Sequence, residues 1–279
     1  MLIDAHAHLD RYQGALETAL EEIAQYRIFT ISNSLDIPSY KRNLEIADGC
    51  DLVLATFGVH PWNAPEYVDH LESLGNDIRN SPLLGEIGLD FHFVEDESRY
   101  PIQRKVFEFF LKAARDQGKI VNVHTKGAER DVLSLLDRYE IDRAIIHWYS
   151  GPIDVLREFA ARGFYLTIGV ELLHSHHVET IAREVPLAQL LTETDNPGGP
   201  KSLTGTMGMP LLVRDVVHKL AELRQSTVNE IVQAVQDNLL QLIRDDPWFP
   251  MTCRRLLAKQ HNGSEGGPRY NQKLWIGGS

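Results

Sequence analysis

The segment Leu2-Ile3-Asp4-Ala5-His6-Ala7-His8 opens the chain with a short apolar run that ends in two histidines. Histidines at positions i and i+2 of a strand point to the same side of it, so one metal ion can bind both. Other residues that can bind metals end or follow later apolar runs in the same way: His60, Glu86, His124, His147 and Asp195. This regularity indicates that one edge of a repeated strand–helix scaffold carries the chemistry.

Eight short apolar or β-branched runs precede residue 200, and each is expected to form a strand. They are Leu2–Ala5, Ile28–Ser32, Leu52–Gly58, Leu83–Leu89, Ile120–Val123, Ala144–Ile146, Phe164–Gly169 and Leu190–Thr194. Segments between them have helical periodicity, as where Phe107, Phe110 and Ala114 fall on one helix face. Alternating strands and helices favour a parallel sheet, and eight repeats predict a (β/α)8 barrel, or TIM barrel, with a C-terminal extension.

Two further helices are expected after the eighth strand. They cover about Met209–Arg224 and Thr227–Asp245. Thr227 is expected to cap the second helix, with Glu230 three residues later as its partner in a capping box. The chain has 279 residues, of which 43% are hydrophobic, and this suffices for one barrel.

The composition changes at Pro247, which divides a barrel domain at residues 1–246 from a tail at residues 247–279. Proline and glycine in the tail favour partial disorder. Aromatic residues are uncommon in disordered tails, yet this one contains Trp248, Phe249, Tyr270 and Trp275. We therefore expect a tail that docks on the barrel or on a partner protein, with a partly disordered tail as the alternative.

The net charge of −11 disfavours a broad, non-specific surface for nucleic acid, because phosphate contacts favour basic surfaces. It does not disfavour a nuclease that recognises one phosphodiester through metal ions, since bound cations dominate the local field. Cys50 and Cys253 indicate no disulfide framework and fit a reducing compartment. The sequence has no secretory signal and no run of about 20 apolar residues, so a cytoplasmic protein without a membrane partner is expected.

The candidate ligands are too numerous for one tetrahedral zinc ion. They comprise four imidazoles and two carboxylates: His6, His8, Glu86, His124, His147 and Asp195. Such a set suits two divalent ions about 3.5–4 Å apart that share a bridging carboxylate. We assign Glu86 as the bridge because it comes from the middle of the strand series. The first ion is then expected to bind His6, His8 and Asp195. The second is expected to bind His124 and His147.

Six motifs follow one another over residues 1 to about 244. They are His6-Ala7-His8, Gly58-Val59-His60-Pro61, Gly85-Glu86-Ile87-Gly88-Leu89-Asp90, Val123-His124-Thr125, His147-x-x-Ser150-Gly151 and Glu193-Thr194-Asp195-x-Pro197. This order resembles that of the TatD-type metal-dependent hydrolases of the amidohydrolase superfamily. The resemblance implies a TIM barrel, two divalent metal ions (zinc, manganese or magnesium) and the six ligands named above. It also implies deoxyribonuclease activity on DNA, often as a 3′→5′ exonuclease.

Catalytic functions can be assigned to three residues. Two cations would lower the pKa of a shared water, so that a bridging hydroxide held beside Glu86 attacks the phosphodiester. Asp195 can accept the proton of that water and is the expected general base. His60 is not needed as a ligand, and the resemblance implies that it contacts a phosphate oxygen or the leaving group. Asp90 and Glu193 are expected to hold ligand side chains in place.

Other residues on the same face have two interpretations each. Trp62, Phe91 and Phe93 would either stack on a nucleobase or pack within their loops. Lys126 would either bind phosphate or extend into solvent.

Two departures from the family pattern concern the substrate side of the site. Trp148 stands beside His147, where relatives commonly have cysteine. The segment Met207-Gly208-Met209-Pro210 stands where relatives commonly have a basic stretch. The six ligands are unaffected by these departures.

Two other functions stay open at this point. The same metal site could hydrolyse an ester or an amide, for example in D-aminoacyl-tRNA deacylation, because attack on carbon and on phosphorus uses the same ligands. Relatives of the family also occur in bacterial anti-phage gene cassettes. The protein could therefore be a nuclease-like subunit of a defence assembly, with a protein partner bound through the tail.

Overall fold

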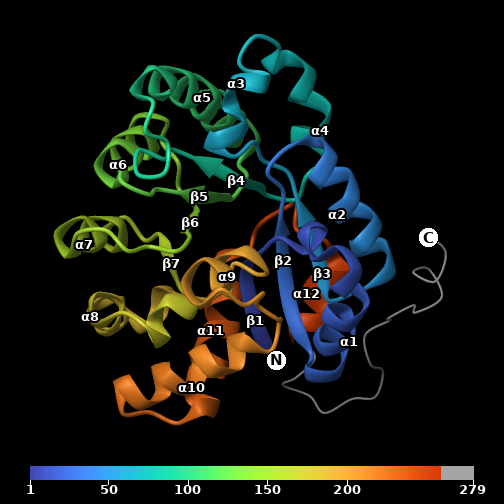
Figure 1. Ribbon diagram of the computed structural model, residues 1–279, viewed down its shortest axis with the longest axis vertical. Coiled ribbons are helices and arrows are strands. Elements are labelled where there is room, and N and C mark those ends of the chain that lie inside the picture. Colours follow the sequence, from blue (N-terminus) through green and yellow to red (C-terminus); the bar gives the residue numbers. More distant parts are fainter. Residues whose placement is uncertain (259–279) are drawn as a thin grey trace.

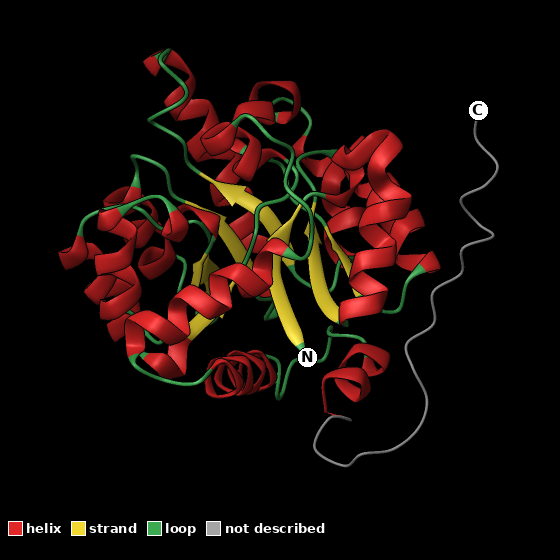
Figure 2. Ribbon diagram, turned by 60° about the horizontal axis from the view of Figure 1, so that its bottom comes forward, coloured by secondary structure: helices red, strands yellow, loops and turns green. Residues whose placement is uncertain are grey.

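The computed structural model describes residues 1–258 and contains eight parallel strands. They are β1 (Leu2–Ala7), β2 (Ile28–Asn33), β3 (Val53–Thr56), β4 (Leu84–Gly88), β5 (Val121–His124), β6 (Ala144–Ile146), β7 (Tyr165–Ile168) and β8 (Leu190–Thr192). Each coincides with a predicted strand, although the ends differ by a few residues. The strands lie at the centre of the molecule with helices around them (Figure 2).

Helices surround the strands and also follow the last of them (Figure 1). They are α1 (Leu16–Tyr26), α2 (Ile37–Gly49), α3 (Ala64–Tyr67), α4 (Gly75–Asn80), α5 (Tyr100–Gln117), α6 (Glu129–Arg138), α7 (Ile153–Ala161), α8 (His176–Glu184), α9 (Gly198–Thr204), α10 (Leu212–Arg224), α11 (Val228–Leu242) and α12 (Met251–Ala258). The three residues that predicted α5, Phe107, Phe110 and Ala114, are all buried. Helix α5 packs against β4, as the periodicity of its apolar face requires.

The strands pair in chain order and close on themselves. Each strand from β1 through β3 pairs in parallel with the next, and so does each strand from β4 through β8. A backbone bridge between Phe57 and Leu84 joins these two groups. At the closing edge the Asp195 N–H donates to the His6 carbonyl at 2.9 Å. The protein is therefore a (β/α)8 barrel, as predicted, and the carboxyl ends of its strands meet at one face.

A buried carboxylate reinforces this closing edge. Asp4, inside β1, accepts hydrogen bonds from the Thr194 N–H at 2.9 Å and from the Thr194 hydroxyl at 2.6 Å. Burying an ionisable group is costly unless it is hydrogen-bonded. The paired contact therefore fixes the segment after β8 against β1, immediately before the candidate ligand Asp195.

Of the helices after β8, α10 and α11 were predicted and α9 was not. Helix α11 begins with the expected capping box, in which the Thr227 hydroxyl accepts from the Glu230 N–H and the Glu230 carboxylate accepts from the Thr227 N–H. Helix α9 was not predicted, because Gly198-Gly199-Pro200 at its start has low helix propensity. It lies on the carboxyl face, close to β1 in the view of Figure 1.

The first part of the tail packs on the opposite end of the barrel. Phe249 is 2% exposed, and its ring centroid lies 6.2 Å from that of Phe29 at the start of β2. The Trp248 indole N–H donates to the carbonyl of the last residue of α5 at 2.8 Å. The other two aromatic residues of the tail, Tyr270 and Trp275, lie outside the described residues.

Replacing Phe249 by alanine is expected to lower the free energy of unfolding by about 3 kcal/mol, because a buried ring is removed and a cavity is left. Urea denaturation of the full chain measures this change. Met251→Ala is the matched control, since Met251 is 62% exposed in the same segment. Equal stability of the two variants would show that the tail adds nothing to the barrel.

Cys50 and Cys253 are both buried, and neither forms a disulfide. The sequence analysis predicted no disulfide framework. Within residues 1–258, no helix has the length and apolar character needed to span a bilayer.

Candidate metal centre

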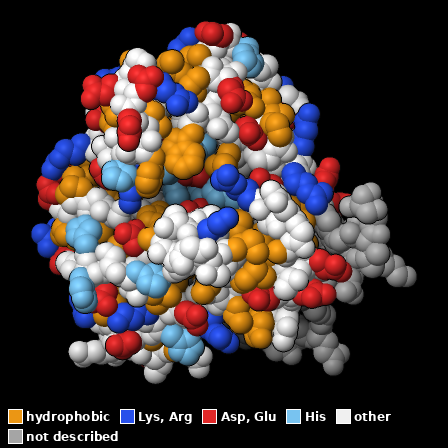
Figure 3. Space-filling model, in the orientation of Figure 1, with side chains coloured by type: hydrophobic (Ala, Val, Ile, Leu, Met, Phe, Trp, Pro, Cys, Tyr) orange, Lys and Arg blue, Asp and Glu red, His pale blue; other side chains and the backbone are white. Residues whose placement is uncertain are grey.

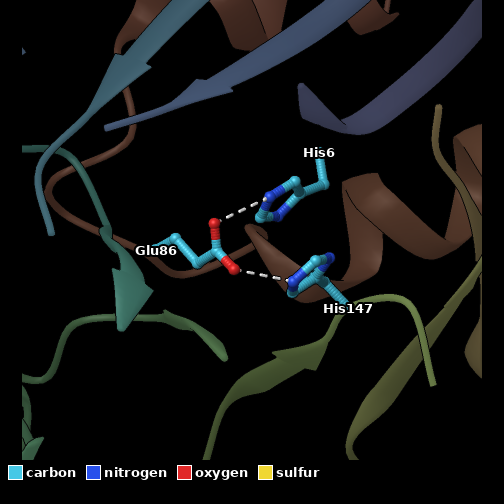
Figure 4. Close-up of side chains that lie close together, drawn as sticks. All are labelled: His6, Glu86 and His147. Atoms are coloured by element: carbon cyan, nitrogen blue, oxygen red, sulfur yellow. Dashed lines mark hydrogen bonds and ion pairs between the residues drawn. The ribbon is translucent and has the colours of Figure 1, made fainter. Parts of the chain in front are cut away.

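The carboxylate of Glu86, in the middle of β4, lies at the centre of a buried group of histidines. Its Oε2 lies 3.4 Å from His6 Nε2 and 3.3 Å from His8 Nε2. Its Oε1 lies 2.8 Å from both His124 Nδ1 and His147 Nε2. Figure 4 shows His6 and His147 directed at the two different oxygens. Oε2 therefore faces the two histidines proposed for the first ion and Oε1 the two proposed for the second, while His6, Glu86 and His147 also offer ligand atoms within 4.8 Å of one another.

Asp195, which follows β8, adds a second carboxylate to the Oε2 side. Its Oδ1 lies 3.1 Å from His8 Nε2 and 3.8 Å from His6 Nε2. These three side chains offer ligand atoms that all lie within 4.8 Å of one another. The histidines at positions i and i+2 of the first strand do converge, since their Nε2 atoms are 3.3 Å apart. This arrangement fits the set proposed for the first ion.

His60 also faces the group, with its Nε2 3.3 Å from Glu86 Oε1. Its Nδ1 accepts a hydrogen bond from the Trp62 backbone N–H at 3.2 Å. Burial lowers the pKa of His60, which favours the neutral ring. A neutral ring that accepts at Nδ1 carries its hydrogen on Nε2. His60 therefore directs a donor at the centre, which fits the expectation that it is not a ligand.

In His6 and His8 the nitrogen that faces away from the centre, Nδ1, is the one beside a hydrogen-bond acceptor. His6 Nδ1 lies 3.0 Å from Asn122 Oδ1, and the amide nitrogen of Asn122 donates to the Ala5 carbonyl, which fixes the orientation of the amide. His8 Nδ1 lies 2.9 Å from the Asn33 carbonyl. In the neutral rings both Nδ1 atoms therefore carry the hydrogen, and both Nε2 atoms can present a lone pair to a metal ion once any second proton has left.

Carboxylates hold the remaining two histidines, as expected for Asp90 and Glu193. His124 Nε2 lies 3.1 Å from Asp90 Oδ2, and His147 Nδ1 lies 3.5 Å from Glu193 Oε2. The His124–Asp90 contact is the hydrogen bond that a metal-binding histidine usually donates from its second ring N–H, whereas the His147–Glu193 contact is an ion pair without a hydrogen bond. Four imidazoles and two carboxylates thus fit a pair of divalent ions by donor type and orientation.

The charges of the cluster are consistent with cation binding. Burial alone would raise the pKa of Glu86, but the imidazoles of His60, His147 and His6 hold it well below its usual range. Burial lowers the pKa of His147, yet Glu86 and Glu193 raise it to about 10. The metal-free cluster therefore keeps its carboxylates ionised and balances them with protons on histidine. Divalent ions would replace these protons, because a ligand must be deprotonated to bind.

A cavity of about 650 Å³ opens above the cluster at the carboxyl ends of the strands. Figure 3 shows the hollow in this face, with pale blue histidine at its floor and hydrophobic and basic side chains at its rim. Trp62 and Phe93 line the cavity. Phe91 instead stacks on Tyr100 with ring centroids 4.0 Å apart, so loop packing is the correct interpretation for this residue.

Trp148 forms another wall of the cavity, next to the ligand His147. Its indole N–H donates to the carboxylate of Glu171, which also lines the cavity. Gly199 in α9 makes room for the indole, because a Cβ there would lie 2.3 Å from the Trp148 ring. The indole that stands here in place of the family's usual cysteine therefore fits because residue 199 in α9 is glycine.

Four residues of the site were not identified from the sequence: Asn33, Asn122, Arg11 and Lys201. Asn122 had a recognisable signal, since it is an amide between two valines of a buried strand. Asn33 contributes a backbone carbonyl, for which the sequence contains no signal. Arg11 lines the cavity from the 3-10 helix Leu9–Ala15 that follows β1, and Lys201 lines it from α9.

The family model described as TatD related DNase matches residues 3–244. The chain belongs to this family. It is 29% identical over 255 residues to YabD of Bacillus subtilis, covering 88% of this chain and 99% of YabD. It is 28% identical over 258 residues to YcfH of Escherichia coli, covering 88% of this chain and 96% of YcfH. Both relatives carry the description "uncharacterized metal-dependent hydrolase".

The fold is shared with a solved TatD homologue. The crystal structure of YjjV from Escherichia coli K12 aligns with a TM-score of 0.79 and 26% identity, covering 86% of this chain and 97% of YjjV. The resemblance inferred from the six motifs is confirmed, and the protein is a metal-dependent hydrolase of the TatD family.

Proposed function

We propose that this TatD-family protein is a deoxyribonuclease that hydrolyses phosphodiester bonds from the 3′ end of DNA. The observation that carries the proposal is one cavity that combines the Glu86-centred cluster with basic side chains. The description of the family as TatD related DNase agrees with it. The polarity rests on the resemblance alone.

Three cations line the cavity: Arg11, Lys126 and Lys201. The chain as a whole has a net charge of −11, so a basic lining is not a consequence of composition. Within residues 1–258 none of the three forms a salt bridge, and Lys126 Nζ donates to the Ser150 hydroxyl at 2.5 Å. An anionic substrate would supply the missing counter-charges. Neutral esters and amides would not, whereas the phosphates of DNA or of an aminoacyl-tRNA would, so the cations favour a nucleic-acid substrate and the assay below separates the two reactions.

The six proposed ligands, His6, His8, Glu86, His124, His147 and Asp195, would hold two divalent ions, of which zinc, manganese and magnesium are the candidates. Such ions supply an activated water and charge neutralisation at the phosphoryl group. Asp195 lies at the rim of the cluster, where its carboxylate can accept a proton from water. The Nε2–H of His60 can donate to a phosphoryl oxygen or to the leaving oxygen. Lys126 can hold the phosphate in place.

The experiment is an assay of the purified full chain with end-labelled single-stranded DNA. The protein is stripped with EDTA and reloaded with Mg²⁺, Mn²⁺ or Zn²⁺. We expect 5′-labelled DNA to give a ladder that shortens from the 3′ end, and EDTA to abolish it. Protein that binds metal but leaves DNA intact while hydrolysing a D-aminoacyl-tRNA would replace this proposal by the deacylase. A partner bound through the tail and a place in anti-phage defence stay predictions.

A further inference from the structure

Two aromatic side chains at the rim of the cavity are exposed although the loops around them are well packed. Trp62 is 43% exposed and Phe93 is 60% exposed, and both line the cavity above the metal centre. Their rings meet edge to face, with centroids 6.1 Å apart and planes at 84°. Phe91, two residues before Phe93, is covered by Tyr100. Loop packing therefore accounts for Phe91 but leaves the other two rings with uncovered surfaces.

We propose that Trp62 and Phe93 form a stacking platform for one unpaired nucleobase of the substrate, beside the phosphate that is hydrolysed. The proposal rests on the proposed nuclease function and names the part of the nucleotide that this side of the cavity binds. Aromatic rings stack on any base, because every base has a π-face. The cations of the same cavity bind the phosphate, and its volume of about 650 Å³ is within the range of ligand sites.

The platform is attached to the metal centre through the carboxylate of Asp90. Asp90 Oδ2 accepts from the Trp62 indole N–H at 2.7 Å and lies 3.1 Å from His124 Nε2. Asp90 Oδ1 accepts from the Phe93 backbone N–H at 2.8 Å. One buried carboxylate thus holds a proposed ligand and both aromatic residues.

Trp62 has a second attachment, because its backbone N–H donates to His60 Nδ1. Trp62 is therefore held at two points, its indole on Asp90 and its backbone on His60. A base stacked on it would lie in a defined position relative to the Nε2–H of His60 and to His124. Preorganised contacts of this kind align a substrate at little entropic cost.

The test compares Phe93→Ala with the control Tyr26→Ala, which also removes an exposed aromatic ring. Tyr26 lies at the end of α1, is 38% exposed and does not line the cavity. The probes are two single-stranded oligonucleotides that are identical except at the 3′ end. One ends in two thymidines and the other in two abasic tetrahydrofuran residues. The Kd of each fluorescein-labelled strand is measured by anisotropy with EDTA present, and KM and kcat are measured with metal.

For the strand with terminal bases, Phe93→Ala is expected to raise Kd and KM on the order of 10-fold. For the abasic strand no change is expected, and Tyr26→Ala should alter neither strand. Equal effects of Phe93→Ala on both strands, or no effect on either, would overturn the platform. If the wild-type protein cleaves neither strand, the nuclease proposal fails. The anisotropy data then still decide the platform, since base-dependent binding does not require turnover.

Trp62→Phe separates stacking from positioning. Phenylalanine keeps a ring at the rim but loses the indole N–H on Asp90. We expect kcat to fall more than KM rises, and the preference for the strand with terminal bases to persist. Loss of that preference in Trp62→Phe with an unchanged kcat would contradict the attachment through Asp90.

Discussion

Replacing Glu86 by glutamine is expected to lower kcat/KM for DNA on the order of 10³-fold or more and to reduce the metal content of the reloaded protein. The two oxygens of Glu86 face different pairs of histidines, His6 and His8 on one side and His124 and His147 on the other. Glutamine has nearly the same size but one oxygen and no charge. It cannot complete both halves of the centre, so both ions should bind more weakly.

The measurement combines turnover with metal analysis by mass spectrometry on the same samples. Glu95→Gln is the matched control, because Glu95 is exposed in the loop after β4 and the change removes the same charge. The melting temperature without metal shows whether the variant folds. Near-normal turnover in Glu86→Gln would contradict a mechanism in which this carboxylate is shared.

The positions of the proposed ligands could be predicted because a parallel barrel brings the carboxyl ends of all its strands to one face. Glu86 and Asp195 are far apart in sequence, yet Glu86 lies in β4 and Asp195 follows β8, and the structure places both beside His8. The strand ends were less well predicted, since the strand expected over Ile120–Val123 is β5 at Val121–His124, with His124 as its last residue.

The contacts that orient the ligands could not be predicted, because they depend on side-chain directions in loops and strand interiors. Phe91 and Phe93 are two residues apart in one loop, and one packs on Tyr100 while the other is exposed at the cavity. Composition does not distinguish them. Asn122 was recognisable only as a polar residue in an apolar strand, and its contact with His6 required the register of the closed barrel.

Replacing His60 by alanine is expected to lower kcat/KM about 10²–10³-fold while leaving the metal content unchanged. His60 is as close to Glu86 as the proposed ligands are, so distance alone does not distinguish it from them. The hydrogen on Nε2 does, because Nδ1 accepts from the Trp62 N–H. A nitrogen that carries a hydrogen has no lone pair for a metal but can donate to charge that develops on the substrate.

His124→Ala is the matched comparison, since the Nδ1 of His124 faces the same Glu86 oxygen but presents a lone pair to the centre. Metal content per chain should fall in His124→Ala and stay at the wild-type value in His60→Ala. His60→Gln, which restores an N–H donor, should recover part of the lost turnover. If His60→Ala lost as much metal as His124→Ala, His60 would be a ligand in the active protein, and its ring would have to give up the hydrogen bond from the Trp62 N–H or lose its Nε2 hydrogen when metal binds.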